Sequence, residues 1–421
     1  MPSASGPVSR RSSTLTKCYS DSPFCDLDDE ELVTPLRPSE KPSSEPAWRH
    51  YSTSVIWFCK DQWFLIGMII LVIISSQAQV PASRQSKKET VVTYLCVSVI
   101  FIITGCTLPS KTLKENYARW KIHLFVQIQC FLMCSASIYG IVSACATNPS
   151  FMDPAMLVGM IFVACVPTTI SSNVNMTKQA HGNHALTVVQ STLGNLIGPF
   201  ITPLLIEMYT GSGAWYTQIL PPPGALTATY RRVFKQLGLS IYLPFAVGQS
   251  IQNVFPRSTK RILGAWHLSK LSQCALLILI WQVFDSAFET GAFTAVKGDN
   301  MVFIVFISIG LYLAWTTICI SLSLLWLAKY DTIAVAYCVP AKTPAMGVPL
   351  SVVLFTGLST LTKAKIQIPL VIFQGLQIAG GSLLTIPFRK WIQPEGVQEE
   401  AAAILEGQRG DVEGEGALQR R

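Results

Sequence analysis

The sequence predicts an all-α membrane protein with about ten transmembrane helices. Half of its 421 residues are hydrophobic and only 13% are charged, whereas about 25% of the residues of a soluble domain are charged. The mean hydropathy is +0.40. Apolar stretches of roughly 17 to 25 residues, long enough to cross a bilayer, recur from Val55 to Trp391. These observations exclude a soluble globular protein and a protein with one or two membrane anchors.

Ten stretches have the length and hydropathy expected of a span. Lys270, Asp285 and Asp331 interrupt or border their segments, so nine and eleven spans are alternatives to ten. We expect all the spans to form one transporter-sized domain over residues 55–391. The spans lie near residues 62–80, 91–108, 121–146, 156–178, 185–209, 237–255, 263–286, 301–327, 330–360 and 366–388.

Two polar tails flank the spans. Residues 1–50 are rich in Ser and Pro and contain the acidic run DLDDEE, a composition that cannot bury enough apolar area to fold. We therefore expect a disordered cytosolic N-terminal tail over 1–50 and an acidic cytosolic C-terminal tail over 392–421. No apolar run follows Arg10 and Arg11, so we expect the first span, and not a signal peptide, to target the chain.

The basic residues near the span ends favour two cytosolic termini. With the N-terminus inside, thirteen Lys and Arg residues face the cytosol and nine face outward, a weak bias in the direction of the positive-inside rule. Lipid headgroups are sufficient partners for the net charge of +8, so we expect no nucleic-acid partner. The plasma membrane is the expected location, and a secretory-pathway membrane is the alternative.

The sequence carries no sign of a metal centre or an enzyme. Most of the twelve cysteines lie inside predicted spans, where thiols act as small apolar fillers. Cys130 and Cys134 share a helix face, but no His or carboxylate joins them at metal-ligand spacing. The chain has no P-loop, GxSxG or HExxH motif. We expect no metal, no cofactor and no catalytic activity.

Polar residues follow the first half of the fourth predicted span. Residues 166–183 read VPTTISSNVNMTKQAHGN, directly after the apolar run AMLVGMIFVAC. Backbone and hydroxyl groups without partners are unfavourable in hydrocarbon, so such a stretch is stable only where it faces protein or a water-filled cavity. The stretch therefore indicates an interrupted span that lines a site.

The ninth predicted span contains a matching interruption. Cys-Val-Pro at 165–167 is repeated at 338–340, five spans later. Halves with an odd number of spans insert in opposite orientations, and matching proline-interrupted spans indicate a binding site near the midplane of an inverted-repeat transporter. We therefore predict two inverted five-helix repeats with helix breaks at Pro167, Pro340 and Pro344. Two ordinary proline kinks are the alternative.

These residues also resemble a known family. The string PTTISSNVNMTKQAHGNHALTVVQSTLGNLIGPFITPLL is similar to the fourth and fifth spans of the bile acid:sodium symporter family, the solute carrier family 10-like proteins. The HLFVQIQ start of the third span, the MTKxxxGN turn and a lysine in the ninth span resemble most closely the divergent member-seven branch. Fungal proteins of this branch are associated with calcium homeostasis. The similarity runs from about Trp57 to Trp391.

The resemblance implies a division of the ten spans into a panel and a core. Spans 1, 2, 6 and 7 would form the panel, and spans 3, 4, 5, 8, 9 and 10 the core. Spans 4 and 9 would unwind and cross each other. The unwound segments would then present carbonyls to a cation and helix N-termini to an anion.

The resemblance also implies ion-binding residues. The first sodium site of the family maps onto Ser172 and Asn173, with hydroxyl groups from Thr187 and Ser191, and Gln129 matches a glutamine of the second sodium site. For each residue the alternative is a helix–helix hydrogen bond of about 0.6 kcal/mol.

The ninth span departs from the sodium-coupled pattern. Cys338 stands where those members have an acidic residue, and Lys342 stands where they have glutamine. This change removes the negative charge that a sodium ion needs, so sodium coupling is in doubt. Lys342, with Thr343 beside it, is a candidate site residue because intramembrane charge is rare. A fixed cation, a counter-charge for an anion, a proton carrier and a structural lysine are its four possible roles.

Together these observations favour a transporter-like function. We expect alternating-access transport of an unidentified small solute or organic anion, with sodium or a proton as the candidate coupling ion, in negative control of calcium uptake. The alternative is a regulator that transports nothing and restrains calcium influx through a calcium channel or another regulatory partner. Besides the lipid bilayer, these are the partners that we expect.

Overall fold

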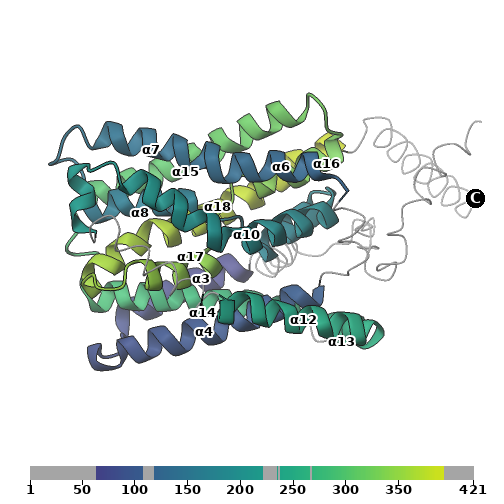
Figure 1. Cartoon of the computed structure of the whole chain (residues 1–421), viewed down its shortest axis with the longest axis horizontal. Coiled ribbons are helices and arrows are strands. Elements are labelled where there is room, and N and C mark those ends of the chain that lie inside the picture. Colours follow the sequence, from purple (N-terminus) through teal and green to yellow (C-terminus); the bar gives the residue numbers. More distant parts are fainter. Residues whose placement is uncertain (1–62, 108–117, 221–234, 236–237, 266–267, 393–421) are drawn as a thin grey trace, which may run out of the picture. The chain divides into compact units, whose positions relative to one another are not determined.

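The computed structural model describes residues 63–107, 118–220, 235, 238–265 and 268–392, and its helices are labelled in Figure 1. The predicted N-terminal tail lies outside these residues, as does the predicted C-terminal tail after Ile392. Every element among the described residues is helical, and none of them is a β-strand. The all-α class predicted from hydropathy is therefore confirmed for this part of the chain.

The first half of the described chain contains seven α-helices and two short helices of other types. A π-helix, η1 (Gln129–Met133), joins α6 to α7, and a 3₁₀-helix, η2 (Trp215–Ile219), follows α10. The α-helices are α3 (Trp63–Gln77), α4 (Ala82–Thr107), α6 (Trp120–Ile128), α7 (Cys134–Cys145), α8 (Pro154–Cys165), α9 (Ser171–Gln179) and α10 (His184–Thr210).

The second half begins with a further π-helix, η3 (Gly238–Tyr242), which leads directly into α12. The α-helices that follow are α12 (Leu243–Val254), α13 (Pro256–Ala265), α14 (Leu268–Glu289), α15 (Gly298–Ser323), α16 (Lys329–Cys338), α17 (Pro344–Leu354) and α18 (Thr360–Ile392).

Six of the described helices are long and apolar enough to cross a membrane, by length and composition. They are α4, the continuous helix from α6 to α7, α10, α14, α15 and α18. The other four predicted spans coincide with shorter elements: α3, α8 with α9, η3 with α12, and α16 with α17. A span that is interrupted fails a length test although its pieces can cross together. The total of ten spans stays a prediction.

Several boundaries differ from the predicted ones. α4 begins at Ala82, before the predicted start at residue 91, because the polar run SRQSKKET continues the helix. The span predicted at 263–286 begins inside α13, because the apolar residues Ile262 and Leu263 belong to this separate helix and not to α14. Hydropathy marks where side chains are apolar, whereas helix ends depend on hydrogen bonds and caps.

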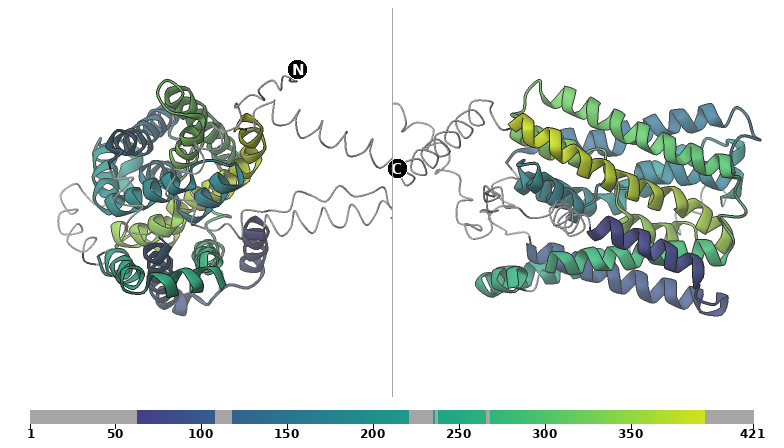
Figure 2. Two further views of the ribbon diagram at one scale, coloured as in Figure 1. Left: turned by 90° about the vertical axis from the view of Figure 1, so that its right-hand side faces the viewer. Right: turned by 180° about the vertical axis from the view of Figure 1, so that it is seen from behind.

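α4 packs against α12 and α14, and α14 also packs against α3; Figures 1 and 2 both show α12 and α14 alongside α4. Gly105 of α4 and Gly248 of α12 allow a close approach, because a Cβ on Gly248 would lie 2.2 Å from the carbonyl oxygen of Ile102. Small residues bring membrane helices together in this way. These four helices are the ones that the resemblance assigns to the panel.

A buried carboxylate joins α14 to the α3–α4 connection. Asp285 is completely buried and accepts hydrogen bonds from the Val80 N–H at 3.0 Å and the Gln85 amide at 2.8 Å. Lys88 forms an ion pair with the same carboxylate. A buried charge is stable only when it is paired and hydrogen-bonded, which explains why Asp285 can border an apolar helix.

The remaining helices pack around α8 and α18, which lie against each other, and α15 packs against α16 and α18. The outer face of α15 is apolar: one side carries a stripe of side chains that are 42–72% exposed, while Leu311 and Trp315 on the other side are buried. A stripe of this kind is expected where a helix faces lipid. The stripe consists of Val302, Phe306, Ile309 and Leu313.

Candidate functional site

The first helix break follows α8, which ends at Cys165, and the chain becomes helical again at Ser171. Pro167 has no N–H and disfavours helical backbone at the preceding residue, and Val166 is extended with φ −78° and ψ 153°. The carbonyls of residues 164 to 168 all accept hydrogen bonds from distant parts of the chain. The donors are Lys342 Nζ to Ala164 and Val166, Thr202 to Cys165, the Thr343 N–H to Pro167, and Asn195 to Thr168.

The second break lies between Cys338, where α16 ends, and Pro344, the first residue of α17. Pro is favoured at this position because the first helical N–H groups have no partner within the helix. Thr343 caps α17 by accepting a hydrogen bond from the Ala345 N–H at 3.2 Å. Its own N–H donates to the Pro167 carbonyl at 2.9 Å. The two breaks are therefore joined directly, backbone to backbone.

Gln377 of α18 holds the backbone of the second break. Its side-chain oxygen accepts a hydrogen bond from the Lys342 N–H, and its amide nitrogen donates to the Lys342 carbonyl, both at 2.7 Å. One amide side chain thus satisfies both backbone groups of a residue that no helix includes. The sequence analysis did not single out Gln377, because one glutamine in an apolar span does not reveal its partner.

The side chain of Lys342 is completely buried at the contact between the breaks. Its Nζ donates to the carbonyls of Cys130 at 2.6 Å, Ala164 at 2.9 Å and Val166 at 3.2 Å. The same atom lies 5.8 Å from the centre of the Trp315 ring, within the range of a cation–π interaction. The Cys130 sulfur, at 3.5 Å from Nζ, is a fourth acceptor. These acceptors suffice for all three N–H donors of an ammonium, whereas a neutral amine has only two. The site is therefore built for a cation.

The π-helix η1 explains why the Cys130 carbonyl is available. The Cys134 N–H donates to the Gln129 carbonyl, five residues back, instead of to Cys130, its partner in a regular α-helix. The freed Cys130 carbonyl then accepts from Lys342. π-helical turns occur frequently at functional sites. The sequence gives no signal of this turn, because the hydrogen-bond shift depends on neighbouring helices.

The residues matched to the first sodium site form a linked polar cluster. Thr187 donates to the Thr177 hydroxyl at 3.0 Å, and Thr177 donates to the Asn173 carbonyl at 2.7 Å. The Ser191 hydroxyl lies 3.8 Å from the Cys338 thiol, which also points toward the Thr187 carbonyl at 3.9 Å. The described residues contain no group of three or more His, Cys, Asp or Glu side chains suited to a metal.

Two members of this cluster bond back to the first break. Ser172 donates to the Thr169 hydroxyl at 3.2 Å, and the Asn173 amide donates to the Thr168 hydroxyl at 2.8 Å. Asn195 of α10 donates to the carbonyls of Thr168 and Ser191, both at 2.8 Å. Thr168, Thr177 and Asn195 are site residues that the sequence analysis missed, although the first two lie in the polar stretch and Asn195 lies in the next predicted span.

Gln129 lies apart from this network. It is buried, and neither atom of its amide has a hydrogen-bond partner among the described residues. Its chain segment reaches the site through the Cys130 carbonyl, which accepts from Lys342, and through the Cys134 thiol, which donates to the Val339 carbonyl at 3.7 Å. Buried amides without partners are rare in folded proteins, so Gln129 is the member of the predicted set whose side chain is available for water or a ligand.

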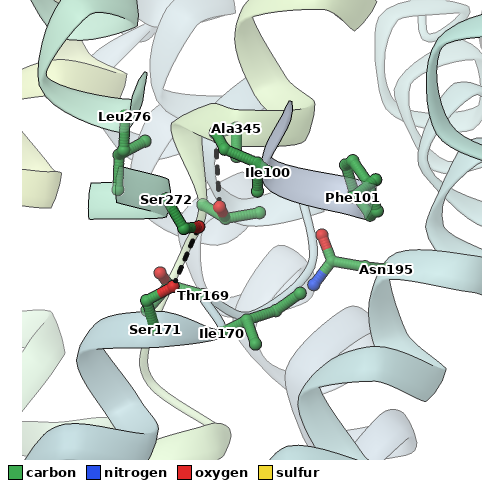
Figure 3. A pocket seen from close by; sticks show the side chains of 10 residues that line it. Ile100, Phe101, Thr169, Ile170, Ser171, Asn195, Ser272, Leu276 and Ala345 are labelled. Atoms are coloured by element: carbon green, nitrogen blue, oxygen red, sulfur yellow. Dashed lines mark hydrogen bonds between the residues drawn. The ribbon is translucent and has the colours of Figure 1, made fainter. Parts of the chain in front are cut away.

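A small cavity lies between the two breaks and the α4–α14 pair, and it has room for about one water molecule. Figure 3 shows Ser171, the first residue of α9, facing Ser272 of α14 across this cavity. Their hydroxyl oxygens lie 3.4 Å apart. Thr169, Thr343 at the start of α17 and Asn195 of α10 are its other polar residues, while Phe101 of α4 and Ala345 are among its apolar ones. The N-terminal ends of α9 and α17 therefore meet at one cavity.

Two aspartates join the ends of the helices around this site. Asp331, in the first turn of α16, accepts a hydrogen bond from the Asn183 amide at 2.8 Å and forms an ion pair with Arg119. Arg119 and Asn183 precede α6 and α10 as their N-cap residues. Asp331 thus connects a helix of the second half to the starts of two helices of the first half.

Asp153, the N-cap of α8, makes the reciprocal connection. It forms an ion pair at 2.8 Å with Lys365 of α18. The Asn300 amide of α15, in the orientation that satisfies both of its groups, bonds to the Asp153 N–H and the Phe151 carbonyl at 3.0 Å each. A helix of the first half is thus connected to the starts of two helices of the second half. We call the Asp331 and Asp153 groups the two clasps.

The comparisons with known proteins identify the family of this chain. The SBF-like CPA transporter family matches residues 62–390. The chain belongs to this family. It is similar to the solute carrier RCH1 of Candida albicans, at 36% identity over 383 residues that cover 82% of this chain and 92% of the relative. The solute carrier RCH1 of Saccharomyces cerevisiae is 32% identical over 404 residues, covering 87% and 92%.

A vertebrate relative of the SBF-like CPA transporter family is also similar. Sodium/bile acid cotransporter 7-B of Xenopus laevis is 27% identical over 339 residues, which cover 79% of this chain and 93% of the relative. The resemblance inferred from the motifs is therefore confirmed. The family and the apolar helices together make this chain a multi-pass membrane protein of the solute carrier type.

Proposed function

We propose that this chain is a secondary transporter that moves a small anionic solute by alternating access, with its binding centre at the contact between the two breaks. The observation that carries the proposal is the buried Lys342 ammonium, which joins the two breaks and η1 and forms no ion pair with a carboxylate among the described residues. Inverted-repeat transporters bind their solutes at paired broken helices. The two clasps support the inverted repeat, because exchanging the halves of the chain exchanges one clasp for the other.

The chemistry of the cavity favours an anion. Ser171 begins α9, and Thr343 and Ala345 lie at the start of α17, so the N-terminal ends of both helices border this cavity. Helix N-termini carry a partial positive charge and are common anion sites. The Lys342 ammonium adds a full positive charge behind them. A carboxylate or sulfonate group matches this environment, whereas a free cation would be repelled.

We further propose that the Lys342 ammonium replaces a coupling cation. The cluster around Thr187, Ser191 and Cys338 offers hydroxyl, thiol and carbonyl groups without an anionic ligand. The Lys342 ammonium already donates hydrogen bonds to three carbonyls at the contact between the breaks, so a sodium ion is not needed to hold these carbonyls together. Transport would then be independent of sodium, and it would contribute to restraining calcium uptake, as the resemblance to the member-seven branch suggests.

Uptake into proteoliposomes tests the transport proposal. The purified chain is reconstituted and offered a panel of radiolabelled organic anions, with and without sodium and proton gradients. We expect uptake of at least one anion that does not change when sodium is replaced by potassium. Ser272→Phe should block this uptake by filling the cavity, and Ser321→Phe, on the exposed face of α15, is the matched control. Uptake that requires sodium would contradict the tethered-cation proposal.

A double substitution tests the role of Lys342 directly. Cys338→Glu with Lys342→Gln restores the side chains of the sodium-coupled pattern. We expect the apparent melting temperature of this variant to rise with sodium concentration and that of the wild type to be the same in sodium and potassium. Cys338→Gln with Lys342→Gln is the control that lacks the charge. A wild type that sodium stabilises would refute the proposal.

The small size of the cavity favours a second candidate, a regulator that does not transport. In this case calcium influx into cells would be restrained through a partner protein. Calcium uptake in cells that express Ser272→Phe separates the two functions. A variant that neither transports nor restrains calcium supports the transporter. A variant that no longer transports but still restrains calcium, at equal abundance in the membrane, supports the regulator.

A further inference from the structure

The helix α13 has a polarity that the transport site does not explain. It follows α12 after Phe255, begins at Pro256, and packs against α12 and α14. At about 100° per residue, Arg257, Lys260 and Arg261 fall on one side of this helix, and Thr259, Ile262 and Leu263 on the other. α13 is thus a basic amphipathic helix at the end of a membrane-embedded one.

Arg257 and Arg261, on the basic side of α13, are exposed and have no acidic partner in the part of the chain that the structure describes. Neither forms an ion pair or a hydrogen bond with a described residue. The sequence itself contains no Asp or Glu between Glu207 and Asp285. Two guanidinium groups one turn apart can bind the same phosphate, because each offers a planar pair of donors.

The apolar side of α13 is partly buried against the protein and partly exposed. Thr259 is 5% exposed and packs inward, whereas Ile262 is 47% exposed. At the start of the helix, Val254 and Phe255 are 65% and 60% exposed. These side chains continue a stripe of exposed apolar side chains on α12, formed by Leu243, Val247 and Ile251, and such a stripe is expected where a helix faces lipid. Lipid acyl chains are therefore the occupant that covers them.

We propose that α13 lies in the membrane interface and binds the phosphate-bearing headgroups of anionic lipids through its basic side, on which the exposed Arg257 and Arg261 lie. Interfacial helices of this type place the apolar face among the acyl chains and the basic face among the headgroups. The expected orientation of the chain puts α13 on the cytosolic side, where anionic lipids concentrate. α13 packs against α12 and α14. The bound lipid would therefore lie next to α14, the helix whose Ser272 borders the cavity.

Native mass spectrometry of the full-length protein tests the charge preference. The protein is released from micelles containing equal amounts of phosphatidylserine and phosphatidylcholine, and the ratio of the two among the first bound lipids is measured. We expect Arg257→Gln with Lys260→Gln and Arg261→Gln to lower this ratio at least about fivefold, the factor that corresponds to ~1 kcal/mol for one basic residue near an anionic surface. An unchanged ratio would overturn the proposal.

A matched control removes three basic residues elsewhere. Arg84, Lys87 and Lys297 are exposed and far from α13 in the sequence, and their replacement by Gln should leave the ratio unchanged. An equal fall in this control would show that only net charge matters, which would also overturn the proposal. Displacement of phosphatidylserine by an excess of inorganic phosphate would identify a free-anion site and refute the lipid assignment.

The depth of α13 is measured separately in proteoliposomes. Bimane is attached to Ile262→Cys or to Arg257→Cys, on a background whose other reactive cysteines are replaced by serine. Nitroxide groups on the lipid acyl chains should quench the label at residue 262 more strongly than the label at residue 257. Equal quenching at the two positions would contradict an interfacial helix even if the charge preference were present.

Discussion

Replacing Lys342 by methionine removes the cation but keeps an unbranched side chain of similar length. The Cys130, Ala164 and Val166 carbonyls then lose their donor at the contact between the breaks. A buried acceptor without a donor costs about 1–3 kcal/mol, so the three together cost roughly 3–9 kcal/mol. Against this, the substitution removes the burial penalty of an ammonium, which is at least ~2.5 kcal/mol in a membrane.

The net expectation is a loss of stability of about 3 kcal/mol. For a domain of this size, that loss lowers the melting temperature by on the order of 5 °C. Thermal unfolding of purified protein in one detergent, followed by tryptophan fluorescence, measures the change. Lys87→Met is the control, because Lys87 is exposed and its loss should leave the melting temperature within about 1 °C.

Lys342→Arg adds information about the charge. It keeps the cation and the donors but places a larger group in a fully buried space, so we expect a melting temperature between those of the wild type and Lys342→Met. A methionine variant as stable as the wild type would refute the reasoning. It would show that the stabilisation from the hydrogen bonds of the ammonium only equals the free-energy cost of its desolvation, as is found for some buried charges.

Substitutions at Gln377, Asp331 and Gly248 test the surrounding contacts by the same thermal assay. Gln377→Leu removes both hydrogen bonds to the Lys342 backbone and should cost about 2–4 kcal/mol; a loss below 1 kcal/mol would mean that the break is held by its other contacts. Asp331→Ala should destabilise more than Arg119→Ala, because it also removes the Asn183 bond, and Arg119→Asp with Asp331→Arg should recover part of the loss if the ion pair matters. Gly248→Ala should cost about 1–3 kcal/mol, because its Cβ would lie 2.2 Å from the Ile102 carbonyl oxygen. Gly140→Ala, which meets nothing within 4 Å, should be neutral or stabilising, and equal effects at the two glycines would contradict the packing argument.

The turn between α9 and α10 depends both on local sequence and on a tertiary contact. The Gly-Asn pair is visible in the sequence, and Asn183 caps α10 by accepting from the Leu186 N–H at 3.0 Å, as such a residue is expected to do. The need for Gly182 is visible only in the structure, where a Cβ would lie 2.6 Å from a methyl carbon of Ile333 in α16. The bond from Asn183 to Asp331 likewise depends on the approach of α16.

The sequence by itself determined the membrane class, the helical character and the places where Pro167 and Pro340 interrupt their spans. These properties follow from hydropathy and from the local geometry of proline, which depend on neighbouring residues. Only the tertiary structure decided what Lys342 touches, because its three carbonyl partners lie 176 to 212 residues away in the sequence. It also decided the π-helical turn at Cys130, the support from Gln377 and the two clasps. Each of these depends on a hydrogen bond between helices far apart in the chain, and a side chain in the sequence does not reveal which helix its donor or acceptor will meet.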